Sequence, residues 1–251
     1  MTVQAHGAYP VTPEAGPGEV PAGTVPAARG EARPARPAAG SDLRGRRPAE
    51  LRRPAGDVVV VSGLPGSGKS TLIRRAAGAA PADGPDGASG ERPEAAAAAG
   101  VRCVDSQDTR DRWERRLPAV LPYGLYRPLV RVAHYAGLRR ALASGDSVVV
   151  HDCGTLPWVR RWLARDARRR GRALHMVLLD VPPEVALEGQ AVRGRGVSGY
   201  AFARHRRAVA RLVAEAERGR PPAGCASVVL LDRTAASALE VIAFDRPDRP
   251  G

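Results

Sequence analysis

Residues 58–75 read VVVVSGLPGSGKSTLIRR, and this stretch decides the fold. The four consecutive valines form a β-branched run that is too short for a helix and is closed by a glycine, which indicates a strand buried in a parallel sheet. The next eight residues, GLPGSGKS at 63–70, match the phosphate-binding pattern G-x-x-x-x-G-K-[ST], and a helical run follows them. Strand, glycine-rich loop and helix in this order are the context that the pattern requires.

The positions of this loop have separate chemical tasks. Its glycines let the backbone turn N–H groups inward toward phosphate oxygens, and the positive N-terminal end of the helix adds to that attraction. The Lys69 ammonium would reach the β- and γ-phosphates, and the Ser70 hydroxyl would serve Mg²⁺. We therefore expect ATP and Mg²⁺ as cofactors, bound by Gly63, Leu64, Pro65, Gly66, Ser67, Gly68, Lys69, Ser70 and Thr71.

Lys69 is the only lysine of the chain, and the other 38 of its 39 basic residues are arginines. A coding bias toward Ala, Arg, Gly and Pro accounts for arginine at solvated positions, which need only a positive charge. The tight loop needs a compact ammonium, because a planar guanidinium would not fit the same curl. We read the net charge of +13 mainly as this bias, so nucleic acid is a disfavoured alternative as a partner.

Five strand-like runs alternate with amphipathic helical patterns along the chain. The expected strands are 57–62, 101–105, 147–152, 173–181 and 227–232, and helical patterns occupy 126–143, 155–171 and 201–218. This alternation predicts an α/β P-loop fold, with a doubly wound five-stranded parallel sheet, helices on both faces and a small lid. Ligands of such sheets bind outside the carboxyl ends of the strands.

Low-complexity segments flank and interrupt this pattern. Residues 1–55 lack a sustained apolar period and are predicted to be a disordered leader, followed by a P-loop domain at 56–245 with a flexible insertion at 78–100 and a tail at 246–251. No apolar run is long enough to span a membrane, and the N-terminus lacks a signal-peptide core. We expect a soluble cytoplasmic protein with buried reduced cysteines and no membrane partner; no pattern indicates its oligomeric state.

Asp152 ends the strand predicted at 147–152 and is the second candidate metal residue beside Ser70. A carboxylate there is suited to hold the hydration shell of Mg²⁺, and the alternative is a cap of the next helix. Cys153 follows it, where many water-activating ATPases carry a glutamate, so a bound hydroxyl is the expected acceptor. The chain has no asparagine, which excludes the N-K-x-D guanine motif of Ras-like GTPases, and it has no L-S-G-G-Q-like signature of ABC-type ATPases.

The segment VDSQDTRDRW at 104–113 follows the second predicted strand. Asp105 or Asp108 is a candidate general base for the acceptor hydroxyl, and Arg110 or Arg112 is a candidate for holding an anionic substrate or the transferring phosphate. The alternative is a helix N-terminus, with Asp105 as its cap and further acids in the first turn.

A second arginine-bearing segment, EGQAVRGRGVSGYAFARHRR at 188–207, reads as a hinge between two helices. Arg193 and Arg195 flank a glycine there, and we expect them to close over ATP and stabilise charge on the γ-phosphate. The alternative is two solvated arginines. The histidines at 134, 151, 175 and 205 are interpreted as structural or surface residues.

With GLPGSGKST, DTR at 108–110, VVVHDCG and LLDVPPEVALEGQAVRGRG, residues 57–232 resemble small P-loop kinases of the AAA-domain group. That group includes polynucleotide-kinase-like, zeta-toxin-like and small-molecule phosphotransferase members. The resemblance implies ATP with Mg²⁺, a five-stranded parallel core and transfer to a hydroxyl. In polynucleotide-kinase-like members the general base is an aspartate three positions before the arginine, where this chain has Gln107. The choice of base therefore stays open between Asp105 and Asp108.

Three functions compete at this point. The favoured one is an ATP-dependent kinase that moves the γ-phosphate to a hydroxyl of a small molecule or nucleotide. The alternative is an ATPase switch that regulates a partner protein. The third is a nucleic-acid-binding module or polynucleotide kinase, for which charge is the only support, since aromatic residues are 4% of the chain.

Overall fold

The computed structural model describes residues 39–77, 101–118, 122–151, 156–192 and 198–245. Six parallel strands form its main sheet in the order β1-β7-β6-β3-β5-β4. This confirms the predicted α/β class and parallel sheet, although the sheet has six strands and five were predicted. The five expected strands are β3 (Val58–Gly63), β4 (Val101–Val104), β5 (Ser147–His151), β6 (Leu174–Leu179) and β7 (Ser227–Leu231).

The sixth strand comes from the segment predicted to be a disordered leader. Here β1 (Gly40–Asp42) pairs with β7, and β2 (Glu50–Pro54) pairs with β8 (Val241–Asp245) in a second, two-stranded sheet. The predicted boundary at residue 55 is therefore wrong for residues 39–55. Only Leu51 and Arg53 of β2 are buried, which leaves no apolar run to read in the sequence. Residues 1–38, the insertion 78–100 and the tail 246–251 lie outside the described residues.

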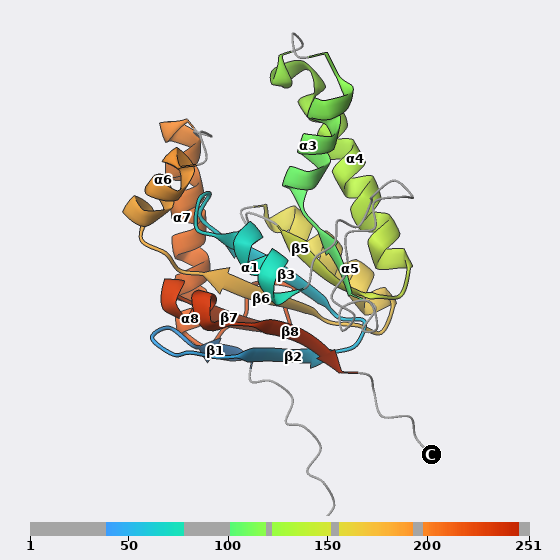
Figure 1. The fold of residues 1–251 in the computed structure, drawn as a ribbon. Helices are drawn as coiled ribbons and strands as arrows, with labels where there is room; N and C mark the ends of the chain where they lie inside the picture. Colours follow the sequence, from blue (N-terminus) through green and yellow to red (C-terminus); the bar gives the residue numbers. More distant parts are fainter. Residues whose placement is uncertain (1–38, 78–100, 119–121, 152–155, 193–197, 246–251) are drawn as a thin grey trace, which may run out of the picture. The chain divides into compact units, whose positions relative to one another are not determined.

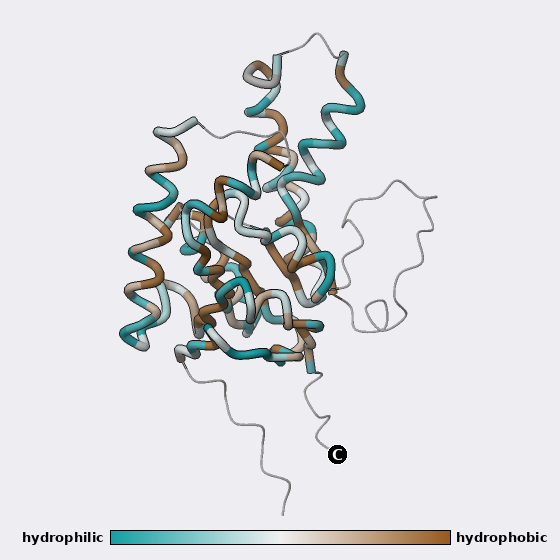
Figure 2. Tube along the Cα trace, turned by 60° about the vertical axis from the view of Figure 1, so that its left-hand side comes forward, coloured by the Kyte–Doolittle hydropathy of each residue, from teal (hydrophilic) through white to brown (hydrophobic). Residues whose placement is uncertain are grey.

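Helices cover both faces of the main sheet (Figure 1). One face carries α1 (Lys69–Ala76), α8 (Arg233–Ala238) and the β2–β8 pair, and the other carries α4 (Tyr123–Ala143), α5 (Pro157–Arg169) and α7 (Gly199–Glu217). Successive valines of β3 alternate between the two cores, as a strand buried on both faces requires. In Figure 2 the strands are mainly brown, while teal and brown segments alternate along the helices. No described helix is long and apolar enough to cross a bilayer.

The carboxyl ends of the strands bring the candidate residues to one edge of the sheet. The P-loop follows β3, α3 (Ser106–Arg116) follows β4, α6 (Pro183–Ala191) follows β6, and α8 follows β7. Because all these strands are parallel, the four following segments begin at the same edge.

Candidate active site

All three glycines of the P-loop, at 63, 66 and 68, have positive φ, and the last two differ in the space around them. Gly66 has φ 89°, and a Cβ at this position would collide with the Ala186 carbonyl oxygen of α6. Gly189 of the same helix also lies against Gly66, since a Cβ there would collide with the Gly66 oxygen. Gly68 caps α1 with φ 95°, and no atom lies within 4 Å of a Cβ built on it. The loop therefore needs glycine at 66 for space and conformation, and at 68 for conformation alone.

Lys69 extends back into the curl of the loop. Its ammonium donates to the carbonyl oxygens of Gly63, at 3.0 Å, and Leu64, at 2.7 Å, and the residue is 4% exposed. The Ser67 hydroxyl is also buried, with no hydrogen-bond partner in the described part of the chain. A buried ammonium beside an unpartnered hydroxyl in a glycine cradle is suited to receive phosphate oxygens.

Sequence reasoning missed Gln190, which fixes the loop from α6. Its Nε2 donates to the Pro65 carbonyl oxygen at 3.1 Å, and the side chain is buried. Only the close approach of α6 to the loop reveals this role, because the short segment 183–191 carries no motif for it. Both β3, which leads into the P-loop, and α6, which contacts it, therefore fix the position of the loop.

A cavity of about 390 Å³ opens from the P-loop between α1, α6 and α8. Arg75 of α1 connects its walls: its Nε donates to the Leu239 carbonyl at 3.1 Å, and it also bonds to the Ala236 carbonyl. Apolar side chains line the cavity inside, while charged groups stand at Arg75, Glu188 and Arg233. An apolar slot that continues from a phosphate cradle has the form expected for the nucleoside of a bound nucleotide. Its apolar lining includes Leu72, Leu179, Val181, Val185, Val192 and Ala236.

Asp105 lies between β4 and α3, and its side chain contacts groups of α3, β5 and α1. Its Oδ1 accepts a hydrogen bond from the Gln107 N–H at 2.8 Å, which makes it the N-cap of α3, and lies 2.7 Å from His151 Nδ1. Burial tends to raise the pKa of Asp105, but its contacts with His151, Gln107 and the Ser70 hydroxyl outweigh burial and lower it. The structure therefore brings Asp105 beside Ser70 and holds it ionised.

Asp108, in the first turn of α3, has the opposite electrostatic character. Burial and the nearby negative charges of Asp105 and Asp111 raise its pKa above the usual range of a carboxyl. Arg110 on the same helix is engaged by Glu114, its Nε donating to Oε1 at 2.6 Å. The two aspartates that sequence reasoning left open thus differ: Asp105 is tied to its neighbours, while Asp108 holds its proton more tightly.

Two histidines that the sequence indicated as structural lie near these groups. The charges of Asp105 and His151 act on His134, whose pKa is lowered by burial. Burial and the charges of Arg204 and Lys69 lower the pKa of His205 on α7. The Nδ1 atoms of both histidines are buried without a hydrogen-bond partner among the described residues. Spacing gave no signal for either, because each comes from a helix distant in sequence from the P-loop.

Three predicted site residues, Asp152, Arg193 and Arg195, lie outside the described residues. Two of the three cysteines are described, and both are free thiols. Burial raises the pKa of Cys103 to about 12 and that of Cys225 to about 11, so neither thiol is a nucleophile at neutral pH.

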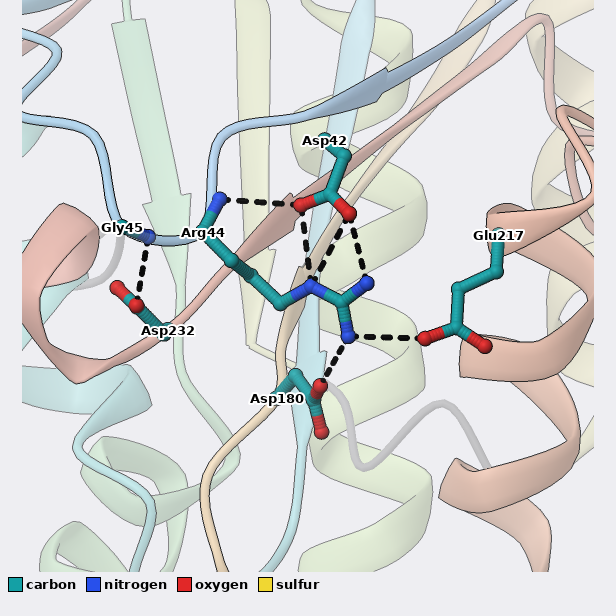
Figure 3. A network of polar contacts seen from close by, with 6 residues as sticks. All are labelled: Asp42, Arg44, Gly45, Asp180, Glu217 and Asp232. Atoms are coloured by element: carbon teal, nitrogen blue, oxygen red, sulfur yellow. Dashed lines mark hydrogen bonds and ion pairs between the residues drawn. The ribbon is translucent and has the colours of Figure 1, made fainter.

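The segment after β1 makes polar contacts with the end of β6, with α7 and with the start of α8 (Figure 3). Arg44 contacts three carboxylates: Asp42 at 2.6 Å, Asp180 at 2.7 Å and Glu217 at 2.9 Å. The next residue, Gly45, donates its N–H to Asp232 Oδ2 at 2.7 Å. The other oxygen of Asp232 accepts from Ala235 N and caps α8, the helix that lines the cavity.

Residues 58–218 match the model of the AAA domain family. The chain belongs to this family. The match runs from β3 through α7 and so includes the P-loop, α3, α6 and the cradle that they form. Membership of a P-loop AAA family, expected from GLPGSGKST and the later segments, is confirmed. No curated protein matches the sequence.

Several solved structures resemble this AAA domain protein at low sequence identity. The PezAT toxin–antitoxin system of Streptococcus pneumoniae is 14% identical, with a TM-score of 0.48 and coverage of 74% of this chain and 77% of that chain. A putative kinase from Chloroflexus aurantiacus is 13% identical, with a TM-score of 0.45 and coverage of 71% and 88%. A gluconokinase from Sinorhizobium meliloti is 19% identical, with a TM-score of 0.38 and coverage of 74% and 93%.

Proposed function

We propose that the protein is an ATP-dependent phosphotransferase that moves the γ-phosphate of ATP to a hydroxyl of a small molecule or nucleotide. The observation that carries the proposal is the position of α3. It begins at Asp105, beside Ser70 of the P-loop, and places a carboxylate with a raised pKa one turn further on. A phosphate cradle with such a carboxylate on the helix that begins beside it is suited to phosphoryl transfer to a hydroxyl.

The residues present fit ATP and Mg²⁺. The buried, unpartnered Ser67 hydroxyl and the Lys69 ammonium would hold phosphate oxygens, and the 390 Å³ cavity would hold the nucleoside. Ser70, with Asp105 ionised beside it, and Asp152, the next residue in the sequence after β5, would hold Mg²⁺, whose charge offsets that of the phosphates. Arg193 and Arg195 would close over the transferring phosphate.

We assign the general base to Asp108 rather than Asp105. Asp105 is committed to capping α3 and to its contact with His151, and its lowered pKa makes it a weak proton acceptor. The raised pKa of Asp108 makes this carboxylate the better acceptor of a hydroxyl proton. Asp105 then serves as the charged group that keeps Ser70 and the start of α3 in place.

The test is transfer of labelled γ-phosphate to a panel of hydroxyl compounds, comprising sugars, nucleosides and aromatic alcohols. Lys69→Ala serves as the blank, and Asp105→Asn and Asp108→Asn separate the two carboxylates. We expect an acceptor to accelerate ADP release, and Asp108→Asn to abolish that acceleration while ATP binding persists. If no acceptor accelerates ADP release and a partner protein does, the ATPase switch replaces the kinase. If Lys69→Ala binds and turns over ATP normally, both fail.

A further inference from the structure

His205 interrupts the apolar stripe by which α7 packs against the P-loop. Phe202 and Val209 of this stripe are buried in one cluster with Leu64, the second residue of the P-loop. His205 comes three residues after Phe202 and four before Val209, so it lies on the same side of the helix. The charge of Lys69 is close enough to act on its imidazole. A half-buried histidine therefore stands where α7 passes the phosphate cradle.

Packing alone does not account for this imidazole. Its Nδ1 atom is buried and has no hydrogen-bond partner among the described residues. His175, in contrast, has a partner for each of its two ring nitrogens. An apolar side chain at 205 would complete the stripe without leaving a polar atom unpaired. The position thus keeps a hydrogen-bonding group that the described fold does not use, and a ligand is what would use it.

The groups around His205 indicate the chemistry of that ligand. The Ser67 hydroxyl of the P-loop is likewise buried without a partner in the described part of the chain, and the Lys69 ammonium lies in the same loop. Hydroxyl, imidazole and ammonium can all donate hydrogen bonds. A ligand that they share must be rich in acceptors and negatively charged, as the phosphate chain of a nucleotide is.

The electrostatics of His205 suit a neutral donor. Burial and the positive charges of Arg204 and Lys69 lower its pKa. Arg204 comes from α7 itself and Lys69 from the start of α1, so both elements disfavour the charged ring. A neutral imidazole carries one N–H. It can supply a hydrogen bond beside Lys69 without placing a second full positive charge there.

We infer that His205 is a phosphate-binding residue of the nucleotide site, which donates a hydrogen bond through Nδ1 to a phosphate oxygen of ATP beside Lys69. The inference rests on ATP binding at the P-loop, which is part of the proposed function, but it requires no hydroxyl acceptor. Under it, α7 completes the cradle that β3, the P-loop and α6 begin.

The experiment measures, by isothermal titration with Mg²⁺ present, the binding of ATP and of inorganic tripolyphosphate to the full chain. His205→Ala removes the imidazole. His205→Asn keeps an amide close to the place of Nδ1, while His205→Gln carries its amide out to the place of Nε2. The matched control is His134→Ala. Nδ1 of His134 is also buried without a described partner, but the charges that act on this ring are those of Asp105 and His151.

We expect His205→Ala to weaken ATP and tripolyphosphate by the same factor, about 10- to 100-fold, because it loses a hydrogen bond to a charged group. His205→Asn should recover most of the affinity and His205→Gln should not. His134→Ala should stay within about twofold of the unmodified chain. Melting curves check that each variant folds, and the comparison of Asn with Gln carries the test even if His205→Ala does not fold.

Four results would overturn the inference: unchanged binding in His205→Ala, a loss confined to ATP, an equal loss in His134→Ala, or rescue by Gln rather than Asn. Failure of the unmodified chain to bind tripolyphosphate would overturn it as well. None of the four bears on phosphotransfer, which fails instead if no hydroxyl compound accelerates ADP release. A loss of affinity in His205→Ala would stand in that case too.

Discussion

The two ends of the main sheet both carry buried polar side chains, and they differ in how those side chains are satisfied. At the amino end, His175 lies 2.8 Å from Ser227 Oγ through Nδ1 and 2.9 Å from Asp57 Oδ2 through Nε2. The other oxygen of Asp57 accepts from Ala173 N at 2.8 Å. At the carboxyl end, Ser67 Oγ and His205 Nδ1 are buried with no hydrogen bond to the described chain.

Residue types alone would place a site at the wrong end. Serine, histidine and aspartate in contact, lining a cavity of about 620 Å³, have the composition of a hydrolase triad. Yet Ser227 is 1% exposed on a regular strand, and every partner in the trio is already saturated. The trio joins β3, β6 and β7. At the other end, polar atoms are left unpaired beside a glycine cradle, and unpaired polar atoms are what a ligand satisfies.

The largest effect should come from the cradle, where Gly66→Ala and Gly68→Ala form a matched pair. Both positions have positive φ, but only a methyl at 66 collides with the Ala186 carbonyl. We expect Gly66→Ala to abolish ATP binding. Gly68→Ala should weaken it by about tenfold at most, the cost of roughly 1 kcal/mol of backbone strain. Isothermal titration with ATP measures both, and equal losses would show that the contact with α6 does not shape the loop.

Asp108→Asn should have the next largest effect, on chemistry alone. Removing a general base costs about 10²–10⁴-fold in rate, and we expect that loss in acceptor-dependent kcat with the affinity for ATP unchanged. Since burial and neighbouring acids raise the pKa of Asp108, the ionised form is disfavoured in the fold. Stability therefore falls as pH rises through the carboxyl range, and Asp108→Asn should melt higher than the unmodified protein at pH 7.

The pH profile supplies the control for this assignment. With Asp108 as base, kcat/KM rises with pH along an acid limb displaced upward from the usual carboxyl range, and Asp111→Asn keeps that limb but moves it toward lower pH, because the charge of Asp111 helps to raise the pKa of Asp108. A limb that disappears in Asp105→Asn and survives in Asp108→Asn would return the role of base to Asp105.

The sequence predicts the elements that their own residues define, and it misses those that form only through contacts with distant parts of the chain. The valine-rich strands and GLPGSGKS need no partner to be recognised, and they gave the central strands, the α/β class and the P-loop. The strands β1 and β2 were missed because GSD and ELRRP contain little to bury, and only pairing with β7 and β8 makes them strands. The role of Gln190 was hidden for the same reason.

The candidate base illustrates the same limit at the level of one helix. The segment 104–113 indicated both a helix start and a pair of possible bases, and spacing could not separate them. The structure confirms that Asp105 caps α3. Burial and neighbouring charges raise the pKa of Asp108, whereas the contacts of Asp105 lower its pKa. Such a difference depends on burial and on the charges of other elements, so it has no signature in a single sequence.

At the amino end, His175→Leu should cost stability and leave catalysis unchanged. Loss of the imidazole leaves one Asp57 oxygen and the Ser227 hydroxyl buried without their partner, a cost of about 2–4 kcal/mol. For a domain of this size, that lowers Tm by roughly 5–15 °C. Calorimetry measures the change, and kcat/KM at a temperature well below Tm should match the unmodified protein. A fall in kcat/KM without a fall in Tm would show that the trio has a function at this end.

The smallest effect should come from Arg44→Gln, which tests whether the segment after β1 tunes the carboxyl end. Arg44 holds Asp180 and Glu217, and its neighbour Gly45 holds Asp232, the cap of α8 (Figure 3). These contacts are partly exposed, so their loss is worth at most about 1 kcal/mol. We expect the KM for ATP to rise about threefold with kcat unchanged, because α8 lines the cavity but carries no reacting group.

Arg52→Gln is the control for this variant. Arg52 pairs with Glu50 and Asp245 on the small sheet, so its replacement removes the same charge at a place away from α8. A purely structural Arg44 would leave KM as low as in that control. A parallel fall in kcat would instead mean that the segment after β1 acts on the P-loop itself. A rise in KM without a change in kcat would therefore connect residues 43–47, which were predicted to belong to a disordered leader, to the cavity that α8 lines.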